Sequence, residues 1–286
     1  MGIPISWYPG HMARARRQIE EAIRQVDAVI EVVDARLPLG SRNPELQELL
    51  ARRPHLIVGS KADLADPATT KAWLAHWESQ GEAAVAVDLA APETRNVLQR
   101  QLNRFSARRP GRRSVRWLVV GIPNVGKSTL INCLAREAKA RTGAKPGLTR
   151  GTQWIRIAGG HYLLDSPGLL WPKLDPPERG LKLAWIGCIG ENAFDPETVA
   201  RALLDFLMQR EPERLEKRYG IRSAADADLL ETLAVKRGML LKGGVPDLER
   251  AAATVLKEFR DGTLGRISLE HPADFEDESE QGGEAP

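Results

Sequence analysis

Cysteine is scarce in this sequence and long apolar runs are missing, and each shortage argues against a class of protein. The two cysteines, Cys133 and Cys188, are far apart and have no CxxC spacing. This argues against a disulfide framework or a zinc site and favours a reducing cytoplasm. No run of about 18 apolar residues occurs, so we expect no membrane span. Residues 1–7 also lack the pattern of a secretory signal.

Basic residues are absent from the end of the chain. Residues 273–286 carry six acids, whereas the whole chain has a net charge of +3, so the body of the chain is more basic than the total suggests. A basic body is compatible with a polyanionic partner and equally with a merely solvated surface. The acidic tail itself is predicted to be disordered.

The stretch that carries chemistry is Gly121-Ile122-Pro123-Asn124-Val125-Gly126-Lys127-Ser128. It follows an apolar run over residues 115–120 and opens onto a helical pattern over residues 129–139, which is the context of a phosphate-binding P-loop. Its glycines let backbone N–H groups turn toward an anion, and the helix N-terminus adds partial positive charge. Lys127 would reach the β- and γ-phosphates, and the Ser128 hydroxyl would bind Mg²⁺. The predicted phosphate-binding residues are Asn124, Val125, Gly126, Lys127, Ser128 and Thr129.

A second motif, Asp165-Ser166-Pro167-Gly168, ends a predicted strand over residues 162–164. It has the DxxG form that lies near the γ-phosphate in GTPases. Asp165 would hold Mg²⁺ through a water molecule, and the Gly168 N–H would sense the phosphate. Thr149 matches the switch threonine that completes Mg²⁺ coordination.

A third motif, Ser60-Lys61-Ala62-Asp63, follows a predicted strand over residues 55–59 and resembles the NKxD motif that recognises guanine. The Asp63 carboxylate can accept hydrogen bonds from guanine N1–H and the 2-amino group together. Adenine offers neither donor, which supports discrimination of roughly 10⁴ or more. Ser60 replaces the usual asparagine, so we expect a weaker tether to the P-loop and a somewhat lower affinity. Leu89 and Ala90 occupy the second base-recognition loop, without its usual serine-alanine.

The order of these motifs predicts an unusual fold. Strands expected over residues 28–33, 55–59 and 83–87 alternate with helices, which is typical of an α/β, mostly parallel sheet with helices on both faces. Asp63 precedes Lys127, the reverse of most GTPases, so the domain must be circularly permuted. We expect this GTPase domain over residues 1–175, an all-helical, RNA-binding domain over 176–272, and the acidic tail over 273–286.

The permuted order and several short stretches resemble the circularly permuted GTPases of the ribosome biogenesis GTPase A (YlqF/RbgA) family, over roughly residues 7–269. The stretches are Trp7-Tyr8-Pro9-Gly10-His11-Met12, Asp34-Ala35-Arg36-Leu37-Pro38, Arg237-Gly238 and Lys242-Gly243-Gly244. The resemblance implies a slow GTPase, stimulated by the ribosome, that acts in late assembly of the large ribosomal subunit. It implies GTP or GDP and Mg²⁺ as ligands, and we expect a cytoplasmic monomer.

The resemblance also bears on catalysis. Leu169 stands where Ras-like GTPases have the glutamine that orients the attacking water. The family uses a histidine at the position of His11, and an imidazole can orient water or accept a proton. The resemblance further suggests that Asn124 helps to hold K⁺ against the phosphates. The sequence alone allows His11 to be a surface residue, in a loop expected over residues 3–12.

Two groups of basic residues are candidates for RNA contact. Arg14, Arg16 and Arg17 stand near the start of a helix expected over residues 13–26, where positive charge opposes the helix dipole. Lys236, Arg237 and Lys242 lie in the helical domain. Two other hypotheses remain open: an RNA-binding module with a mainly structural guanine nucleotide, and an ATP-using P-loop enzyme, which Asp63 opposes.

Overall fold

The computed structural model of the protein describes residues 9–50, 53–107, 114–142, 154–170, 176–223 and 228–275, with backbone alone for residues 9–12 and 136–142. The strands are β1 (Ala28–Asp34), β2 (His55–Ser60), β3 (Ala83–Ala86), β4 (Arg116–Val120), β5 (Trp154–Arg156) and β6 (Tyr162–Asp165). The first five helices are α1 (Pro9–Ile23), α2 (Pro44–Leu50), α3 (Pro67–Ser79), α4 (Thr94–Ala107) and α5 (Lys127–Thr142). The next five are α6 (Pro177–Trp185), α7 (Pro196–Arg210), α8 (Pro212–Tyr219), α9 (Leu229–Lys236) and α10 (Leu248–Arg260). Short 3₁₀ helices cover Ala158–Gly160, Glu191–Ala193 and Pro272–Phe275.

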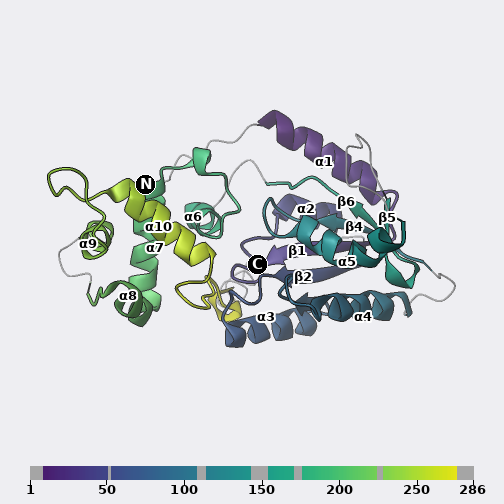
Figure 1. The fold of residues 1–286 in the computed structure, drawn as a ribbon. Helices are drawn as coiled ribbons and strands as arrows, with labels where there is room; N and C mark the ends of the chain where they lie inside the picture. Colours follow the sequence, from purple (N-terminus) through teal and green to yellow (C-terminus); the bar gives the residue numbers. More distant parts are fainter. Residues whose placement is uncertain are drawn as a thin grey trace, which may run out of the picture. The chain divides into compact units, whose positions relative to one another are not determined.

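The strands form one sheet in the order β3-β2-β1-β4-β6-β5. Figure 1 labels β1, β2, β4, β5 and β6 in this sheet. All neighbouring strands are parallel except β5, which pairs with β6 as an antiparallel edge. The predicted α/β class with a mostly parallel sheet is therefore confirmed. The N-terminal strands β1–β3 extend the sheet on the other side of β4 from β5 and β6, which is how a permuted chain builds a continuous sheet.

Helices cover both faces of this sheet, as the alternation of strand side chains requires. Val29 and Leu118 pack with helices α1 and α2 in one apolar cluster. Val33 points to the same face as Val29 and packs against Trp73 and Trp77 of α3. Trp117 points to the opposite face, where its ring lies 4.7 Å from that of Phe105 in α4.

The sheet topology brings the sequence motifs to one edge. Because parallel strands run in one direction, their carboxyl ends meet at the same edge of the sheet. Asp34 at the end of β1 is in register with Ser60 at the end of β2. Val119 of β4, just before the P-loop, is in register with Asp165 at the end of β6.

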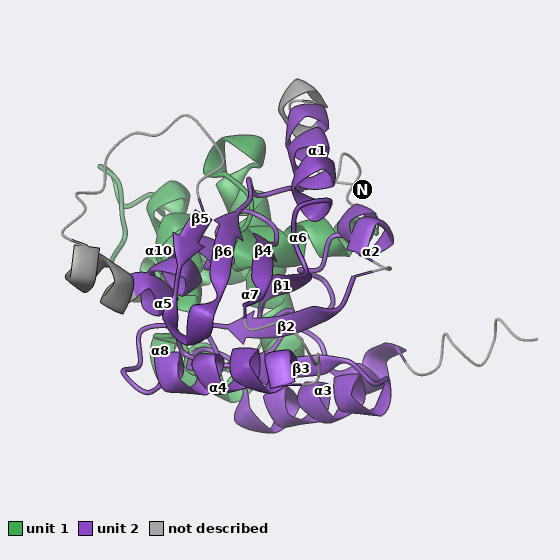
Figure 2. Cartoon of the chain, turned by 90° about the vertical axis from the view of Figure 1, so that its right-hand side faces the viewer, with its two compact units in different colours: residues 1–7, 173–267 green, residues 8–172, 268–286 purple. Residues whose placement is uncertain are grey.

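The chain forms two compact units (Figure 2). The described residues from 9 to 170 and from 268 to 275 belong to the sheet unit, and those from 176 to 267 belong to a helical unit. The sequence predicted a domain boundary near residue 175, and in addition placed residues 268–272 in the helical domain. The structure groups these last residues with the sheet instead.

Long-range contacts explain why residues 268–275 leave the helical unit. The Leu269 N–H donates to the Arg36 carbonyl at 2.7 Å, and the Trp73 indole N–H donates to the Glu270 carbonyl at 3.2 Å. The ring of Phe275 lies 5.9 Å from that of Trp73. Residues 273–275, expected to begin a disordered tail, therefore end an ordered 3₁₀ helix because Phe275 is anchored by an apolar contact. The remainder of the predicted tail lies outside the described residues.

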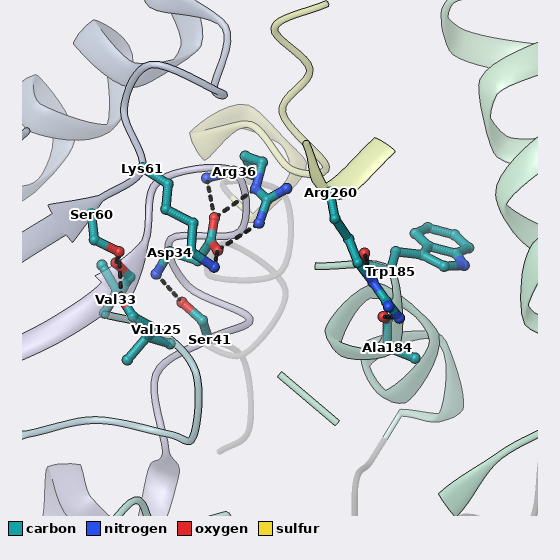
Figure 3. Close-up of polar contacts among 10 residues, drawn as sticks. All are labelled: Val33, Asp34, Arg36, Ser41, Ser60, Lys61, Val125, Ala184, Trp185 and Arg260. Carbon is teal, nitrogen blue, oxygen red and sulfur yellow. Dashed lines mark hydrogen bonds and ion pairs between the residues drawn. The ribbon is translucent and has the colours of Figure 1, made fainter. Parts of the chain in front are cut away.

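The helical unit is organised around α7. Asp195 caps this helix by accepting from the Thr198 N–H at 2.9 Å, as the sequence predicts. Leu203 and Leu207 on its inner face are fully buried. Arg260 of α10 donates to the carbonyls of Ala184 and Trp185 at the end of α6 (Figure 3). Such a contact satisfies carbonyl groups that the last turn of a helix leaves open.

Two helix boundaries differ from those expected. The helix expected over residues 13–26 begins at Pro9 and ends at Ile23, so residues 9–12 are helical rather than part of a loop. Proline suits the first turn because its fixed φ is helical and its missing N–H has no intrahelical partner there. The helix expected to follow Ser223 is capped by Asp228, which accepts from the Leu230 N–H at 2.9 Å.

Candidate functional site

The P-loop has the backbone geometry that anion binding requires. Gly121 has φ +149°, and a Cβ there would lie 2.4 Å from the Val32 carbonyl oxygen. Gly126 has φ +102°, and Asn124 adopts the left-handed conformation with φ 61°. Helix α5 begins at Lys127, with the Leu130 N–H donating to the Gly126 carbonyl at 2.8 Å. The loop therefore delivers a helix N-terminus, with Ser128 and Thr129 exposed in its first turn.

Lys127 lies where the P-loop meets the DxxG motif. Its ammonium group donates to the Ile122 carbonyl at 2.8 Å, and the residue is only 8% exposed. A Cβ built on Gly168 would lie 3.1 Å from Lys127 Nζ and 3.0 Å from the Pro123 backbone. The fold thus brings the second motif against the first. The close approach favours glycine at residue 168, because a side chain there would crowd the P-loop backbone.

The charge of Lys127 also affects the pKa of Asp165. Desolvation by the surrounding protein raises the pKa of the Asp165 carboxyl group, and the nearby Lys127 ammonium group opposes that rise. Ser166 fixes the start of the motif by donating to the Val119 carbonyl at 2.6 Å. A hydroxyl at Ser128 and a carboxylate at Asp165 are oxygen ligands of the kind that Mg²⁺ prefers, so the residues present fit this ion.

The base-recognition loop is tied directly to the P-loop. The Ser60 hydroxyl lies 2.5 Å from the Val125 carbonyl oxygen and 3.0 Å from the Val33 carbonyl oxygen, and its single proton can serve one of them at a time (Figure 3). Serine is therefore long enough to reach the P-loop, in contrast to the loose tether that its length suggested. The expected lower nucleotide affinity stays a prediction.

The two base-recognition segments are joined to each other. The Val87 N–H donates to the Gly59 carbonyl at 2.8 Å, and the Ala62 N–H donates to the Val87 carbonyl at 3.2 Å. A Cβ on Gly126 would lie 3.1 Å from the Leu89 side chain, so Leu89 packs against the P-loop. The Ala90 N–H donates to the Asp88 carboxylate at 2.8 Å. Asp63 is exposed in the turn that these contacts fix.

Leu169 is part of the core. It is 1% exposed and packs in the apolar cluster that joins α1 and α2 to the sheet. The Asn43 side-chain amide donates to its carbonyl oxygen at 2.9 Å. Leu169 therefore serves to hold α1, the helix whose first turn contains His11. The side chain of His11, and Thr149 as a whole, lie outside the described residues, so their predicted roles stay predictions.

The basic candidates for RNA contact differ in their surroundings. Arg16 is exposed and pairs with Glu20 at 3.1 Å and with Glu45 of α2 at 3.2 Å. Arg14 and Arg17 are exposed on α1. In the helical unit Arg237 lies 3.7 Å from Glu258. Lys236 and Lys242 are exposed beside the apolar residues Val235, Leu240, Leu241 and Val245.

Three residues near the site were not predicted from the sequence: Asp34, Arg36 and Glu270. Asp34 and Arg36 form a fully buried ion pair beside Lys61. The only sequence signal was the stretch Asp34-Ala35-Arg36-Leu37-Pro38, which contributed to the family resemblance without a role of its own. Glu270 was also missed, because nothing local indicates that a residue so late in the chain returns to the loop after β1.

The described helices include none with the length and apolar character that crossing a bilayer demands.

Comparisons with known proteins agree with this geometry. Residues 116–216 match the family model described as 50S ribosome-binding GTPase. Ribosome biogenesis GTPase A of Bacillus cereus is 40% identical, over 96% of this chain and 97% of that protein. Mitochondrial ribosome-associated GTPase 1 of Mus musculus is 36% identical, over 92% of this chain and 89% of that protein. The solved structure of GNP-bound YlqF from T. maritima superposes with a TM-score of 0.67 at 32% identity, and covers 91% of this chain and 98% of that chain.

The P-loop, the DxxG glycine against Lys127 and the serine-tethered base loop all occur on a permuted sheet, and relatives of this identity match nearly the whole chain. The chain therefore belongs to the ribosome biogenesis GTPase A family of GTPases.

Proposed function

We propose that this GTPase is an assembly factor for the large ribosomal subunit, which binds the precursor particle with GTP and leaves it after hydrolysis. The observation that carries the proposal is the meeting of three separate motifs at one sheet edge, with Gly168 against Lys127 and Ser60 against Val125. The partner is supported by the family description, which names the 50S particle, and by the names of the bacterial and mitochondrial relatives.

In this proposal each part of the edge has one task. The P-loop from Asn124 to Thr129 surrounds the phosphates with backbone N–H groups, and Lys127 offsets their charge. Ser60, Lys61, Asp63, Leu89 and Ala90 form the guanine site. Ser128, Thr149 and Asp165 would hold Mg²⁺, which when bound neutralises charge that develops on the β- and γ-phosphates. The Gly168 N–H faces the γ-phosphate, so loss of that group releases the loop.

Basic residues outside the nucleotide site are proposed to bind the ribosomal particle. The exposed basic residues that are proposed to contact rRNA phosphates are Arg14 and Arg17 in the sheet unit and Lys236, Arg237 and Lys242 in the helical unit. Arg16 contributes less in this proposal, because two glutamates already pair with it. We further propose that the protein acts as a monomer in the cytoplasm.

The test is GTP turnover in K⁺ buffer, measured for the protein alone and with purified large or small subunits. We expect slow turnover alone and strong stimulation by large subunits, below the upper scale of roughly 10³–10⁵ that arginine fingers reach. Equal stimulation by small subunits would contradict the choice of partner. No stimulation by mature or precursor large particles would overturn the proposed switch.

The second candidate is an RNA-binding module with a mainly structural guanine nucleotide. The buried Leu169 favours it, because the position that usually orients water belongs to the core. This candidate predicts tight guanine nucleotide binding and rRNA binding with turnover that no particle changes. The same turnover experiment therefore separates the two candidates.

Potassium is the remaining proposed cofactor. We expect GTP hydrolysis to be about tenfold or more faster in K⁺ than in Na⁺, because a cation against the phosphates supplies charge at the transition state. Asn124→Gly should reduce this ratio to about one while leaving GDP affinity nearly unchanged. Glycine adopts the left-handed φ of 61° readily and removes the side chain that carries the amide oxygen. An unchanged ratio in the variant would show that Asn124 has no part in the cation effect.

A further inference from the structure

A buried ion cluster lies beside the base-recognition loop. The Asp34 carboxylate has no exposed side-chain surface and accepts from Arg36 Nε and Nη2, each at 2.9 Å (Figure 3). The same carboxylate accepts from Lys61 Nζ at 2.9 Å. Burial alone would raise the pKa of Asp34, but Arg36 and Lys61 overcome it and hold the pKa well below its usual range. Asp34 is therefore a fixed negative charge with two cationic partners.

The two cationic partners of Asp34 differ in their exposure to solvent. Arg36 is 2% exposed and binds Asp34 through a two-point contact, which fixes the direction of the carboxylate. Lys61 is 29% exposed and comes from the turn after β2, where its own φ of 56° lies in the left-handed region. A residue other than glycine adopts that conformation only when its surroundings hold it there. The ion pair with Asp34 is one contact that holds it.

The turn is held from both sides. Ser60, just before Lys61, contacts the P-loop carbonyl of Val125, and Lys61 contacts the end of β1 through Asp34 (Figure 3). Asp63 follows two residues later, so its position depends on both contacts. The direction of the Asp63 carboxylate matters because its pairing with guanine needs two simultaneous hydrogen bonds.

The loop that presents Arg36 is itself braced by the C-terminal segment. The Leu269 N–H donates to the Arg36 carbonyl at 2.7 Å, and the Glu270 carboxylate accepts from the Gly40 N–H at 2.9 Å. Glu270 is 5% exposed and also accepts from the Leu39 N–H. Residues 268–270 thus hold the loop that contains Arg36, and Arg36 in turn orients Asp34. These residues directly follow the helical unit in the sequence.

We propose that Asp34 is a positioning residue for guanine nucleotide binding: oriented by Arg36, it holds Lys61 and thereby the turn that presents Asp63 to the base. The inference rests on the proposed guanine site. It assigns a role to a side chain that touches neither the base nor the phosphates, and it makes the strength of nucleotide binding depend on the Asp34–Lys61 pair.

The test compares Asp34→Asn, Lys61→Met and the double variant by the dissociation constant for GDP and by thermal unfolding. We expect each single variant to bind GDP roughly tenfold more weakly, since charge-assisted hydrogen bonds are the strong ones. The double variant should lose little more than either single one, because both changes remove the same pair. For Asp34→Asn, turnover at saturating GTP should stay within about twofold of the wild type, because Asp34 touches neither the base nor the phosphates, so its loss appears in KM and not in kcat.

The matched control is Asp27→Asn. Asp27 is also buried, precedes the same strand at its opposite end and accepts from the Arg116 N–H at 3.0 Å. This variant should lower thermal stability without changing GDP affinity. Equal losses of affinity in Asp27→Asn and Asp34→Asn would overturn the inference and indicate a general loss of stability.

Other outcomes are also decisive. Fully additive losses in the double variant, or wild-type affinity in Lys61→Met, would overturn the role of the pair. Lys61→Met tests the pair from its more exposed side if Asp34→Asn does not fold. Failure of the proposed guanine site gives a different result, since the wild-type protein would then show no preference of guanine over adenine nucleotides.

Discussion

Asp63→Asn is expected to remove most of the preference of this protein for guanine over adenine nucleotides, a loss of roughly 10⁴-fold in the ratio of the two affinities. The Asp63 carboxylate is exposed in the turn after β2 and can accept from guanine N1–H and the 2-amino group together. An asparagine side chain offers one acceptor and one donor in that place. Its amide N–H₂ would face a donor of guanine, so one favourable hydrogen bond becomes a repulsive contact.

The same argument predicts which base the variant prefers. Xanthine has a carbonyl oxygen where guanine has its 2-amino group, so the asparagine amide can donate to it while its oxygen accepts from N1–H. Dissociation constants for GDP, ADP and xanthosine diphosphate, measured for both proteins, check this expectation. We expect the variant to bind the xanthine nucleotide most tightly.

Asp66→Asn is the matched control for this change. Asp66 lies three residues after Asp63 and accepts from the Thr69 N–H at 2.7 Å as the N-cap of α3. Asparagine caps a helix about as well as aspartate, so stability and base preference should both remain. If Asp63→Asn kept the wild-type ratio of GDP to ADP affinity, Asp63 would not be the residue that recognises the base.

The parts of the fold that the sequence predicted well depend on local pattern. Strands β1 and β2 are mostly apolar segments that end in polar residues, although Glu31 interrupts β1, and the P-loop needs only its own glycines and the flanking helix. The resulting parallel sheet then brings distant motifs to one edge without further information. This is why the order of Asp63 and Lys127 was enough to predict a permuted domain.

The parts that it missed depend on contacts between distant residues. Glu270 binds the backbone of Gly40, and Leu169 packs under α1, and neither contact leaves a local pattern. Helices α6 and α8 were not predicted as separate elements, because they are short, at 9 and 8 residues, and offer few positions for apolar periodicity. The contact of the Ser60 hydroxyl with the Val125 carbonyl could not be predicted from the sequence either. It depends on the distance between the P-loop and the turn that follows β2, which the pairing of β1 with β2 sets.

The second large effect concerns His11. We expect His11→Ala to leave GDP affinity unchanged and to reduce particle-stimulated GTP hydrolysis on the order of 10²-fold or more, the usual contribution of a positioned acid or base. Leu169 is buried in the core, so the usual water-orienting position is occupied by a packing residue. His11 stands in the first turn of α1, and that helix packs through Ala15 and Ile19 on the cluster that contains Leu169.

Two further variants separate the possible roles of His11. His11→Gln can orient water but cannot titrate near neutral pH, so it should keep more activity than His11→Ala if the residue only orients water. Its rate should then lose the pH dependence that a histidine confers. If His11 accepts a proton, the glutamine variant should be as slow as the alanine variant, and the wild-type rate should fall below about pH 6.5, where an unperturbed imidazole is protonated.

His76→Ala is the control for loss of a histidine from a helix surface. His76 lies in the last turn of α3, where it contacts Gln80 at 3.0 Å, and its loss should leave stimulated hydrolysis unchanged. A matching loss of GDP affinity in His11→Ala would make His11 a structural residue of α1. Full stimulation in His11→Ala would contradict the proposed role of His11 and would show that another group orients the attacking water.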